Sequence, residues 1–137
     1  GNVLAGLRNQ NGEGFKSSRM MMLEHSGEMM KILGGAANAT TNTTIGAVVT
    51  NGKFNKTELK KIAALASNGV VRAISPVNTT ADGDSIFALS VGEVASDANL
   101  AGVACAYAME QAIRRAIRAA EGAYGVPALR DVKSSKN

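Results

Sequence analysis

The sequence has few of the residue types from which catalytic sites are most often built. Among its 137 residues there is one histidine, one cysteine and no tryptophan. The histidine, His25, would have to serve any Ser-His-Asp or Cys-His device, and we interpret it as a surface or packing residue. The cysteine, Cys105, cannot form an internal disulfide. It lies in the apolar run 102–108, where we expect a structural thiol rather than a nucleophile.

Motifs for metals, phosphates and membranes are also missing from the sequence. No group of His and Cys has metal-ligand spacing, and neither G-x-x-x-x-G-K nor G-x-G-x-x-G occurs. We therefore expect no metal and no cofactor. No signal peptide is visible, and no apolar run reaches the roughly 18 residues of a membrane helix. We expect no membrane insertion and a cytoplasmic location.

The basic charge of the chain does not form a clear nucleic-acid surface. The formal net charge is +4, but acidic residues are mixed among the basic ones. The nearest candidate patch is Arg114, Arg115 and Arg118, which share a predicted helix with Glu110 and Glu121. A solvated helix face explains this pattern better than a basic stripe does, so we expect no nucleic-acid partner. A basic binding module remains the alternative, and it predicts strongly salt-dependent binding to polyanions.

Aromatic residues are scarce, so the core must be built from smaller side chains. Hydrophobic residues make up 45% of the chain, and the only aromatic ones are Phe15, Phe54, Phe87, Tyr107 and Tyr124. The length suits one domain or part of one. The sequence opens on the apolar stretch 1–7 without a methionine, from which we expect a chain that starts within a fold.

The order of the predicted elements indicates a mixed α/β unit with helices covering a sheet. We expect a buried strand over 1–8, a Met-rich helix over 19–33 packed in the core, and a loop over 34–42. A buried strand over 43–50, a turn at 51–52 and a helix capped by Asn55 and Glu58 follow, and Ser75–Pro76 stops that helix. A second strand over 85–91 precedes a helix that Asp97 caps and that runs to about Gly122.

One chemistry remains open to a chain that lacks a suitable histidine. An N-terminal threonine carries both a hydroxyl nucleophile and an α-amine base, which titrates near neutral pH. Thr43 begins a predicted strand directly after a loop of small residues. Cleavage of Asn42–Thr43 would make it N-terminal, if its hydroxyl attacks the Asn42 carbonyl. By itself N-T-T is weak evidence, because threonine at the start of a strand is ordinary.

The stretch from Asn42 to Gly92 carries a more specific signal. It contains NTTIGAVVTN and GVVRAISPVNTTADGDSIFALSVG. These segments resemble the family of DmpA-type aminopeptidases, β-peptidyl aminopeptidases and nylon-oligomer (6-aminohexanoate oligomer) hydrolases, in which an Asn-Thr, Asn-Ser or Gly-Ser bond is cut autocatalytically at the start of a strand. The resemblance covers residues 42–122 well and residues 1–41 only loosely. The family pattern matches here at Arg72, Ala73, Ile74, Pro76, Val77, Thr79, Asp82, Gly83, Asp84, Ser85, Phe87, Ala88 and Leu89.

The resemblance implies a role for each residue of the site. Thr43 is the nucleophile, and its amine is the base. Asp82 and Asp84 orient the nucleophile and its ammonium or hold a substrate amine, and alternation along an extended segment predicts that both point to the same side. Asn9 is the oxyanion donor, with Asn11 as a competitor. Without the family match, D-G-D would be interpreted as a turn with solvated acids.

The resemblance also implies a fold and partners. The fold would be an αββα-type sandwich, of which this chain is the C-terminal part. Residues 1–42 would end an upstream α segment, and residues 43–137 would form the catalytic subunit. The rest of the α segment, in this or a separate chain, would complete the pocket, and processed heterodimers would form a homo-oligomer. The chain departs from the family in having Asn78 where many relatives have His, and Arg8 where an apolar residue is usual.

The substrate implied by the resemblance is a small amide or peptide. The threonine nucleophile and paired aspartates favour the nylon-oligomer branch over the β-peptide branch, where serine is usual. A D-, L- or β-aminopeptidase is the alternative within the same class. A non-catalytic binding or structural relative is the alternative outside it, and it predicts a chain that runs uncut through Thr43.

Overall fold

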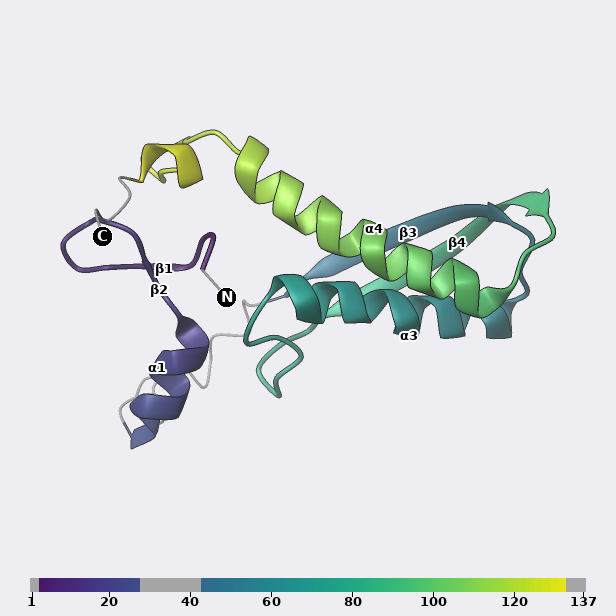
Figure 1. Ribbon diagram of the computed structural model, residues 1–137, viewed down its shortest axis with the longest axis horizontal. Helices are drawn as coiled ribbons and strands as arrows, with labels where there is room; N and C mark the ends of the chain where they lie inside the picture. The colour runs from purple at the N-terminus through teal and green to yellow at the C-terminus, as the bar shows by residue number, and fades with distance from the viewer. Residues whose placement is uncertain (1–2, 28–42, 133–137) are drawn as a thin grey trace. The chain divides into compact units, whose positions relative to one another are not determined.

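A computed structural model describes residues 3–27 and 43–132 of the chain (Figure 1). The chain forms two compact units, one made of residues 39–113 and the other of residues 1–38 together with 114–137. No helix in the described ranges is long and apolar enough to cross a membrane.

The unit of residues 39–113 is built on two parallel strands. Strand β3 (Ile45–Gly52) pairs with β4 (Ser85–Val94), with Ile45 opposite Ser85 and Leu89 opposite Val49. Parallel strands need a crossover connection, which helix α3 (Lys56–Ala73) supplies. Helix α4 (Ala98–Ala119) follows β4 (Figure 1). The predicted mixed α/β arrangement of strand, helix, strand and helix is confirmed.

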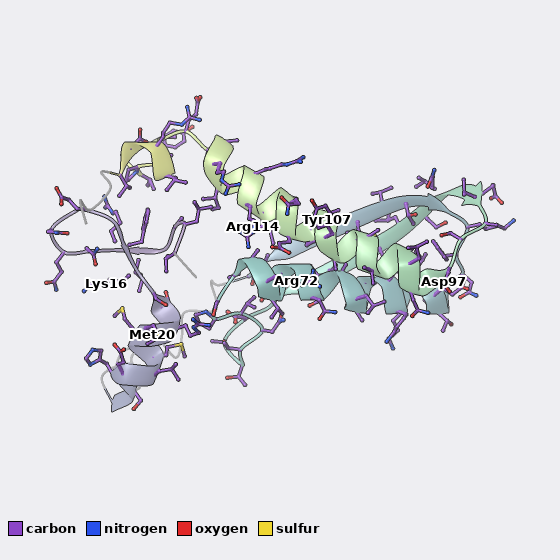
Figure 2. The ribbon with its side chains drawn as sticks, viewed as in Figure 1. Lys16, Met20, Arg72, Asp97, Tyr107 and Arg114 are labelled. Carbon is purple, nitrogen blue, oxygen red and sulfur yellow. The ribbon has the colours of Figure 1, made fainter. Side chains whose placement is uncertain are left out.

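Both predicted helix caps are present. The Asn55 side chain accepts a hydrogen bond from the Glu58 N–H at 3.0 Å, and Glu58 Oε2 accepts one from the Asn55 N–H at 2.8 Å. This reciprocal pair satisfies two N–H groups that a helix start leaves open. Asp97 Oδ1 accepts from the N–H groups of Asn99 and Leu100 at 2.9 Å each, at the start of α4 (Figure 2).

Helices α3 and α4 pack against one face of the sheet. The buried core comes from β3, from both helices and from Phe54, and consists of Val48, Phe54, Ile62, Ala66, Val70 and Met109. The two helices approach closely at Gly69, where a Cβ would overlap the carbonyl oxygen of Ala106. Farther along, Arg72 Nη1 lies 3.7 Å from Glu110 Oε2 of α4 (Figure 2).

The other face of the sheet is apolar and exposed. Ile45 is 73% exposed and Val91 is 70% exposed, and large apolar side chains continue this face at Val49, Phe87 and Leu89. Burial therefore alternates along both strands with a period of two. The prediction of a buried strand over 43–50 is wrong for the side that carries Ile45 and Val49, because the described helices cover only one side of this sheet. The predicted turn at 51–52 is also wrong, since both residues belong to β3.

The second unit contains short elements. Strand β1 (Leu7–Arg8) pairs antiparallel with β2 (Phe15–Lys16). The predicted buried strand over 1–8 is therefore reduced to two exposed residues. Helix α1 (Ser18–Glu24) has no buried residue, so the core packing predicted for its methionines is not found there. Residues 28–33 of the predicted helix lie outside the described ranges. The 3-10 helix η1 (Leu129–Asp131) lies near the end of the chain.

The crossing of α3 and α4 leads to the first prediction. Replacing Gly69 by Ala places a methyl group against the Ala106 backbone, which cannot move aside as a flexible side chain can. We expect the free energy of unfolding to fall by about 1–3 kcal/mol, the usual range for overpacking. Urea titration followed by circular dichroism measures this change.

A matched control lies next to it on the same helix. Asn68 is exposed, and Asn68→Ala should change the free energy of unfolding by less than about 0.5 kcal/mol. Equal stability of Gly69→Ala and the wild type would show that the two helices can separate without loss of packing.

Candidate active site

The predicted nucleophile lies at the point where β3 begins. Thr43 is exposed and immediately precedes the pairing of the two strands, which starts with a hydrogen bond from the Ser85 N–H to the Thr44 carbonyl at 3.0 Å. The Thr43 hydroxyl faces Gly83, where a Cβ would lie 2.9 Å from Oγ1. Glycine at position 83 therefore allows the D-G-D segment to approach Thr43 closely.

Asp84 holds the peptide that follows Thr43. Its Oδ1 accepts a hydrogen bond from the Thr44 N–H at 2.6 Å, and its Oδ2 accepts one from the Asn78 N–H at 3.2 Å. The Thr44 N–H is the main cause that lowers the pKa of Asp84 below its ordinary value of 3.8. Partial desolvation opposes this shift, and the Asn78 N–H adds to it. The carboxylate is therefore charged at neutral pH.

Asp82 has different partners from Asp84. Its Oδ2 accepts from the Thr79 N–H at 2.7 Å, and its own N–H donates to the Thr79 carbonyl at 3.1 Å. Asp82 thus closes a turn within its loop, whereas Asp84 reaches the neighbouring strand. The two carboxylates do not converge on one group in this structure. The catalytic role predicted for Asp82 stays a prediction.

Thr43 and Asp84 belong to opposite sides of the sheet. Alternation along β3 groups Thr43 with the exposed side chains of Ile45 and Val49, and groups Thr44 with the helix-facing Val48. The Asp84 carboxylate bonds the Thr44 amide, and it lines the same cavity as residues of α3. Asp84 therefore contacts the backbone beside the nucleophile from the helix-covered side.

A cavity of about 190 Å³ adjoins Asp84 on that side. Helix α3 forms one wall, and the starts of the two strands and the preceding loop form the rest. Its lining consists of Thr44, Ala63, Ala64, Ser67, Val70, Asn78, Asp84 and Ile86. The sequence analysis did not single out Ser67. Ser67 lies three residues before Val70, which places it on the inner side of α3. This spacing is the feature of the sequence that could have indicated Ser67 as a lining residue.

The remaining predicted residues lie elsewhere or outside the described ranges. Asn9 belongs to the second unit, where its side-chain nitrogen donates to the Glu13 carbonyl at 2.7 Å. Asn11 is in the same turn, and its Oδ1 accepts from the Glu13 N–H at 3.0 Å. The oxyanion role of Asn9 stays a prediction. Asn42, the residue before the predicted cleavage, lies outside the described residues.

The rival groups have no catalytic setting. Cys105 packs against the core, and burial raises the pKa of its thiol, which agrees with a structural role. His25 follows α1 as its C-cap and is exposed. Within residues 3–27 and 43–132, no group of three or more His, Cys, Asp or Glu side chains is placed to hold a metal ion.

Comparison with known proteins identifies the family. Residues 5–129 match peptidase family S58. The chain belongs to this family. The resemblance to DmpA-type aminopeptidases and nylon-oligomer hydrolases is thereby confirmed.

The curated S58 relatives are longer proteins. The chain is 38% identical to an uncharacterized aminopeptidase of Mycobacterium bovis over 86 residues, which is 63% of this chain and 25% of that protein. It is 32% identical to an uncharacterized aminopeptidase of Mycobacterium leprae over 101 residues, 63% of this chain and 28% of the relative. It is 40% identical to a 6-aminohexanoate-oligomer endohydrolase of Kocuria sp. over 53 residues, 39% of this chain and 15% of the enzyme. The chain thus spans about a quarter of its aminopeptidase relatives.

The lowered pKa of Asp84 predicts how stability depends on pH. A carboxylate whose pKa is depressed by folding stabilises the folded state above its unfolded value, and this contribution is lost as the pH falls through the folded value. The side-chain amide of Asp84→Asn keeps one acceptor oxygen, but its nitrogen presents an N–H donor to the N–H of Asn78. We expect Asp84→Asn to be less stable than the wild type at about pH 6, with the difference shrinking toward about pH 2.

Urea titrations over this pH range test the prediction. Glu93→Gln provides the baseline, because Glu93 forms an exposed ion pair with Lys53 at 2.6 Å, and such pairs contribute about 0–1 kcal/mol. A stability difference for Asp84→Asn that does not vary with pH would show that the charge of the carboxylate is not what matters.

Proposed function

We propose that this chain carries the catalytic segment of a self-processing amide hydrolase, with Thr43 as the nucleophile. The observation that carries the proposal is the setting of Thr43 in a chain of family S58. Its hydroxyl lies against Gly83, and Asp84 holds the peptide that follows it. A threonine hydroxyl beside a loop that permits close approach is available for attack, whereas a threonine buried in a strand is not.

The proposed self-cleavage needs no other nucleophile. The Thr43 Oγ attacks the Asn42 carbonyl carbon, the C–N bond to Thr43 breaks, and the amine takes up a proton. The product is an ester between Asn42 and the Thr43 hydroxyl. Water hydrolyses this ester, leaving a carboxylate on Asn42 and a free α-amine on Thr43. Nucleophile and base are then on one residue.

The proposed turnover repeats the same chemistry on a substrate. The Thr43 amine accepts the hydroxyl proton as Oγ attacks the substrate amide, and the leaving amine receives that proton. Water then hydrolyses the acyl-enzyme ester. Asn9 or backbone N–H groups would stabilise the oxyanion, a contribution worth about 10²–10³ in rate. The negative charge of Asp84 close to Thr43 favours the ammonium form of the amine between steps.

The exposed sheet face supports an αββα-type sandwich for the whole fold. Side chains such as Ile45, Phe87 and Val91 form an apolar face on β3 and β4 that helices leave uncovered. A second sheet packed on it would bury these side chains as sheets do in sandwiches. We propose that the α segment upstream supplies this sheet and the rest of the pocket, in the same or a separate chain, and that processed heterodimers assemble into a homo-oligomer.

Two substrate classes fit the proposal. The threonine nucleophile and the Asp82–Asp84 pair resemble the nylon-oligomer branch, and one such relative is a 6-aminohexanoate-oligomer endohydrolase. The second candidate is an aminopeptidase acting on short peptides, which the longer match of 86 residues favours. In both classes the bond to be cut is an amide bond of a small amino-acid-derived oligomer. The proposed attack by Thr43 is therefore the same for either substrate.

Intact-mass spectrometry of the purified chain tests self-processing. We expect the wild type to resolve into two fragments, one ending at Asn42 and the other starting at Thr43. Thr43→Ser keeps a hydroxyl and should still be cut. Thr43→Val has nearly the same shape without the hydroxyl, so we expect it to stay whole. The pair separates loss of the nucleophile from loss of packing.

A wild-type chain that stays whole in this measurement would contradict the proposal. The chain would then be either an arrested precursor or a non-catalytic member of the family that keeps the fold. Assays on amino-amide and 6-aminohexanoate oligomers follow only if the fragments appear.

The apolar face yields a separate prediction. An environment-sensitive apolar dye should bind the isolated chain on this face, and the double variant Phe87→Ser with Leu89→Ser should bind less dye. Its free energy of unfolding should change little, because the two side chains are 57% and 46% exposed. Fluorescence titration measures the dye binding.

Val103 provides the control for the dye experiment. It is 63% exposed on α4, away from the sheet face, so Val103→Ser should leave most of the dye binding intact. Equal losses in the two variants would mean that the sheet face is no more accessible than any other apolar surface of this unit.

A further inference from the structure

Asn78 has an unusual backbone conformation at the entrance to the D-G-D loop. Its φ is 57°, in the left-handed region that few residues other than glycine adopt. Asparagine is one of the residues that tolerates this conformation best. The preceding residue, Val77, packs against the core, so Asn78 stands where the chain leaves the core for the loop.

The left-handed turn has a consequence for Asp84. It directs the backbone N–H of Asn78 to Asp84 Oδ2, at 3.2 Å. The other oxygen of the same carboxylate accepts the Thr44 N–H at 2.6 Å. One side chain thus joins the start of the loop to the peptide that follows Thr43.

The end of the loop is where this connection matters. Asp82 closes a turn with Thr79, and Gly83 follows directly and faces the Thr43 hydroxyl. The loop is therefore held at Asn78 by Asp84 and internally by Asp82. A shift at Asn78 would move Asp84 and Gly83 relative to Thr43.

We propose that Asn78 is a positioning residue for the nucleophile: its left-handed backbone aims its own N–H at Asp84, and Asp84 holds the Thr43–Thr44 peptide in place. The proposal rests on the proposed role of Thr43. It assigns the effect to the backbone of Asn78 and not to its side chain.

The residues around Asp84 show which groups stabilise its charged carboxylate. Helix α3 contributes Ala63, Ala64, Ser67 and Val70 to the cavity beside the carboxylate. Ile86 comes from β4, Thr44 immediately precedes β3, and Asn78 comes from the loop. Among the residues that line this cavity, Asp84 is the only one that titrates, and the nearby Asp82 bonds to Thr79. The N–H groups of Thr44 and Asn78, together with the side chain of Thr44, therefore stabilise the charge of Asp84.

Two substitutions separate the backbone from the side chain. Glycine adopts the left-handed conformation readily, so Asn78→Gly removes the side chain and keeps the turn. A β-branched residue strongly disfavours it, so Asn78→Val removes the side chain and opposes the turn. The first readout is the carboxyl ¹³C titration of Asp84 by NMR, recorded in the whole chain carrying Thr43→Val, where no cleavage occurs.

We expect the pKa of Asp84 to rise toward its ordinary value in Asn78→Val, because a donor that stabilises the charged form is lost. In Asn78→Gly it should stay low. The second readout is the rate of self-cleavage with Thr43 present. It should fall about tenfold in Asn78→Val, the effect expected for one lost hydrogen bond to a charged group, and stay within about twofold in Asn78→Gly.

Each result decides the proposal separately from the function of Thr43. An unchanged pKa and rate in Asn78→Val would overturn it, and so would equal losses in Asn78→Gly, which would assign the effect to the side chain. If circular dichroism shows that Asn78→Val does not fold, Asn78→Ala takes its place against Asn78→Gly. If the wild type is never cut, the proposed function fails, while the Asp84 titration still tests Asn78.

Discussion

The contact between the Asp84 carboxylate and two backbone amides is the interaction on which the site depends. Thr44 and Asp84 are 40 positions apart in the sequence. They meet because parallel strands start at the same edge of a sheet, so the residues that precede β3 and β4 become neighbours. At such an edge an N–H without a strand partner needs another acceptor. Asp84 supplies it for Thr44 and, through its second oxygen, for Asn78.

Small residues allow the rest of the unit to close around this contact. Gly83 leaves space for the Thr43 hydroxyl, and Gly46 leaves space for the side chains of Ile86 and Met109. Gly69 lets α3 approach the backbone of α4. In each case a larger side chain would push apart two segments that the sheet edge brings together. The scarcity of aromatic residues is consistent with this, since the core is assembled from close backbone approaches.

Because α3 and α4 cover one side of the sheet, the chain combines the features of a site with an exposed apolar face on the other side. Helices α3 and α4 cover the side that carries Val48, and they leave Val49 and Leu89 on the opposite side exposed. Thr43 belongs to the exposed side by alternation. A partner that covered this face would therefore also approach Thr43. The S58 relatives, of which this chain spans about a quarter, have the additional length from which such a partner could come.

Much of the fold and part of the site could be predicted from the sequence. The caps at Asn55 and Asp97 were predictable because each involves residues within three positions of one another. Helix α3 was predictable from the periodicity of its apolar residues, and β3 from its β-branched, apolar composition. The family resemblance predicted that Thr43 lies close to the D-G-D segment, and the approach of Gly83 to the Thr43 hydroxyl agrees with this prediction. The buried strand over 1–8 failed, because an apolar run does not show what will cover it.

Only the tertiary structure decided the contacts that depend on strand register and on backbone conformation. The same D-G-D spacing permits both acids to face one group, yet Asp82 turns back to Thr79 and Asp84 crosses to the neighbouring strand. The part played by Asn78 comes from one φ angle and a backbone N–H, which leave little trace in residue type. The sequence by itself determined the order of strand, helix, strand and helix and the caps of both helices, while the choice of Thr43 as nucleophile stays a prediction from the family resemblance. The order and the caps are set by residues a few positions apart, whereas the hydrogen bond from Thr44 to Asp84 joins residues 40 positions apart and exists only after two distant strands have paired.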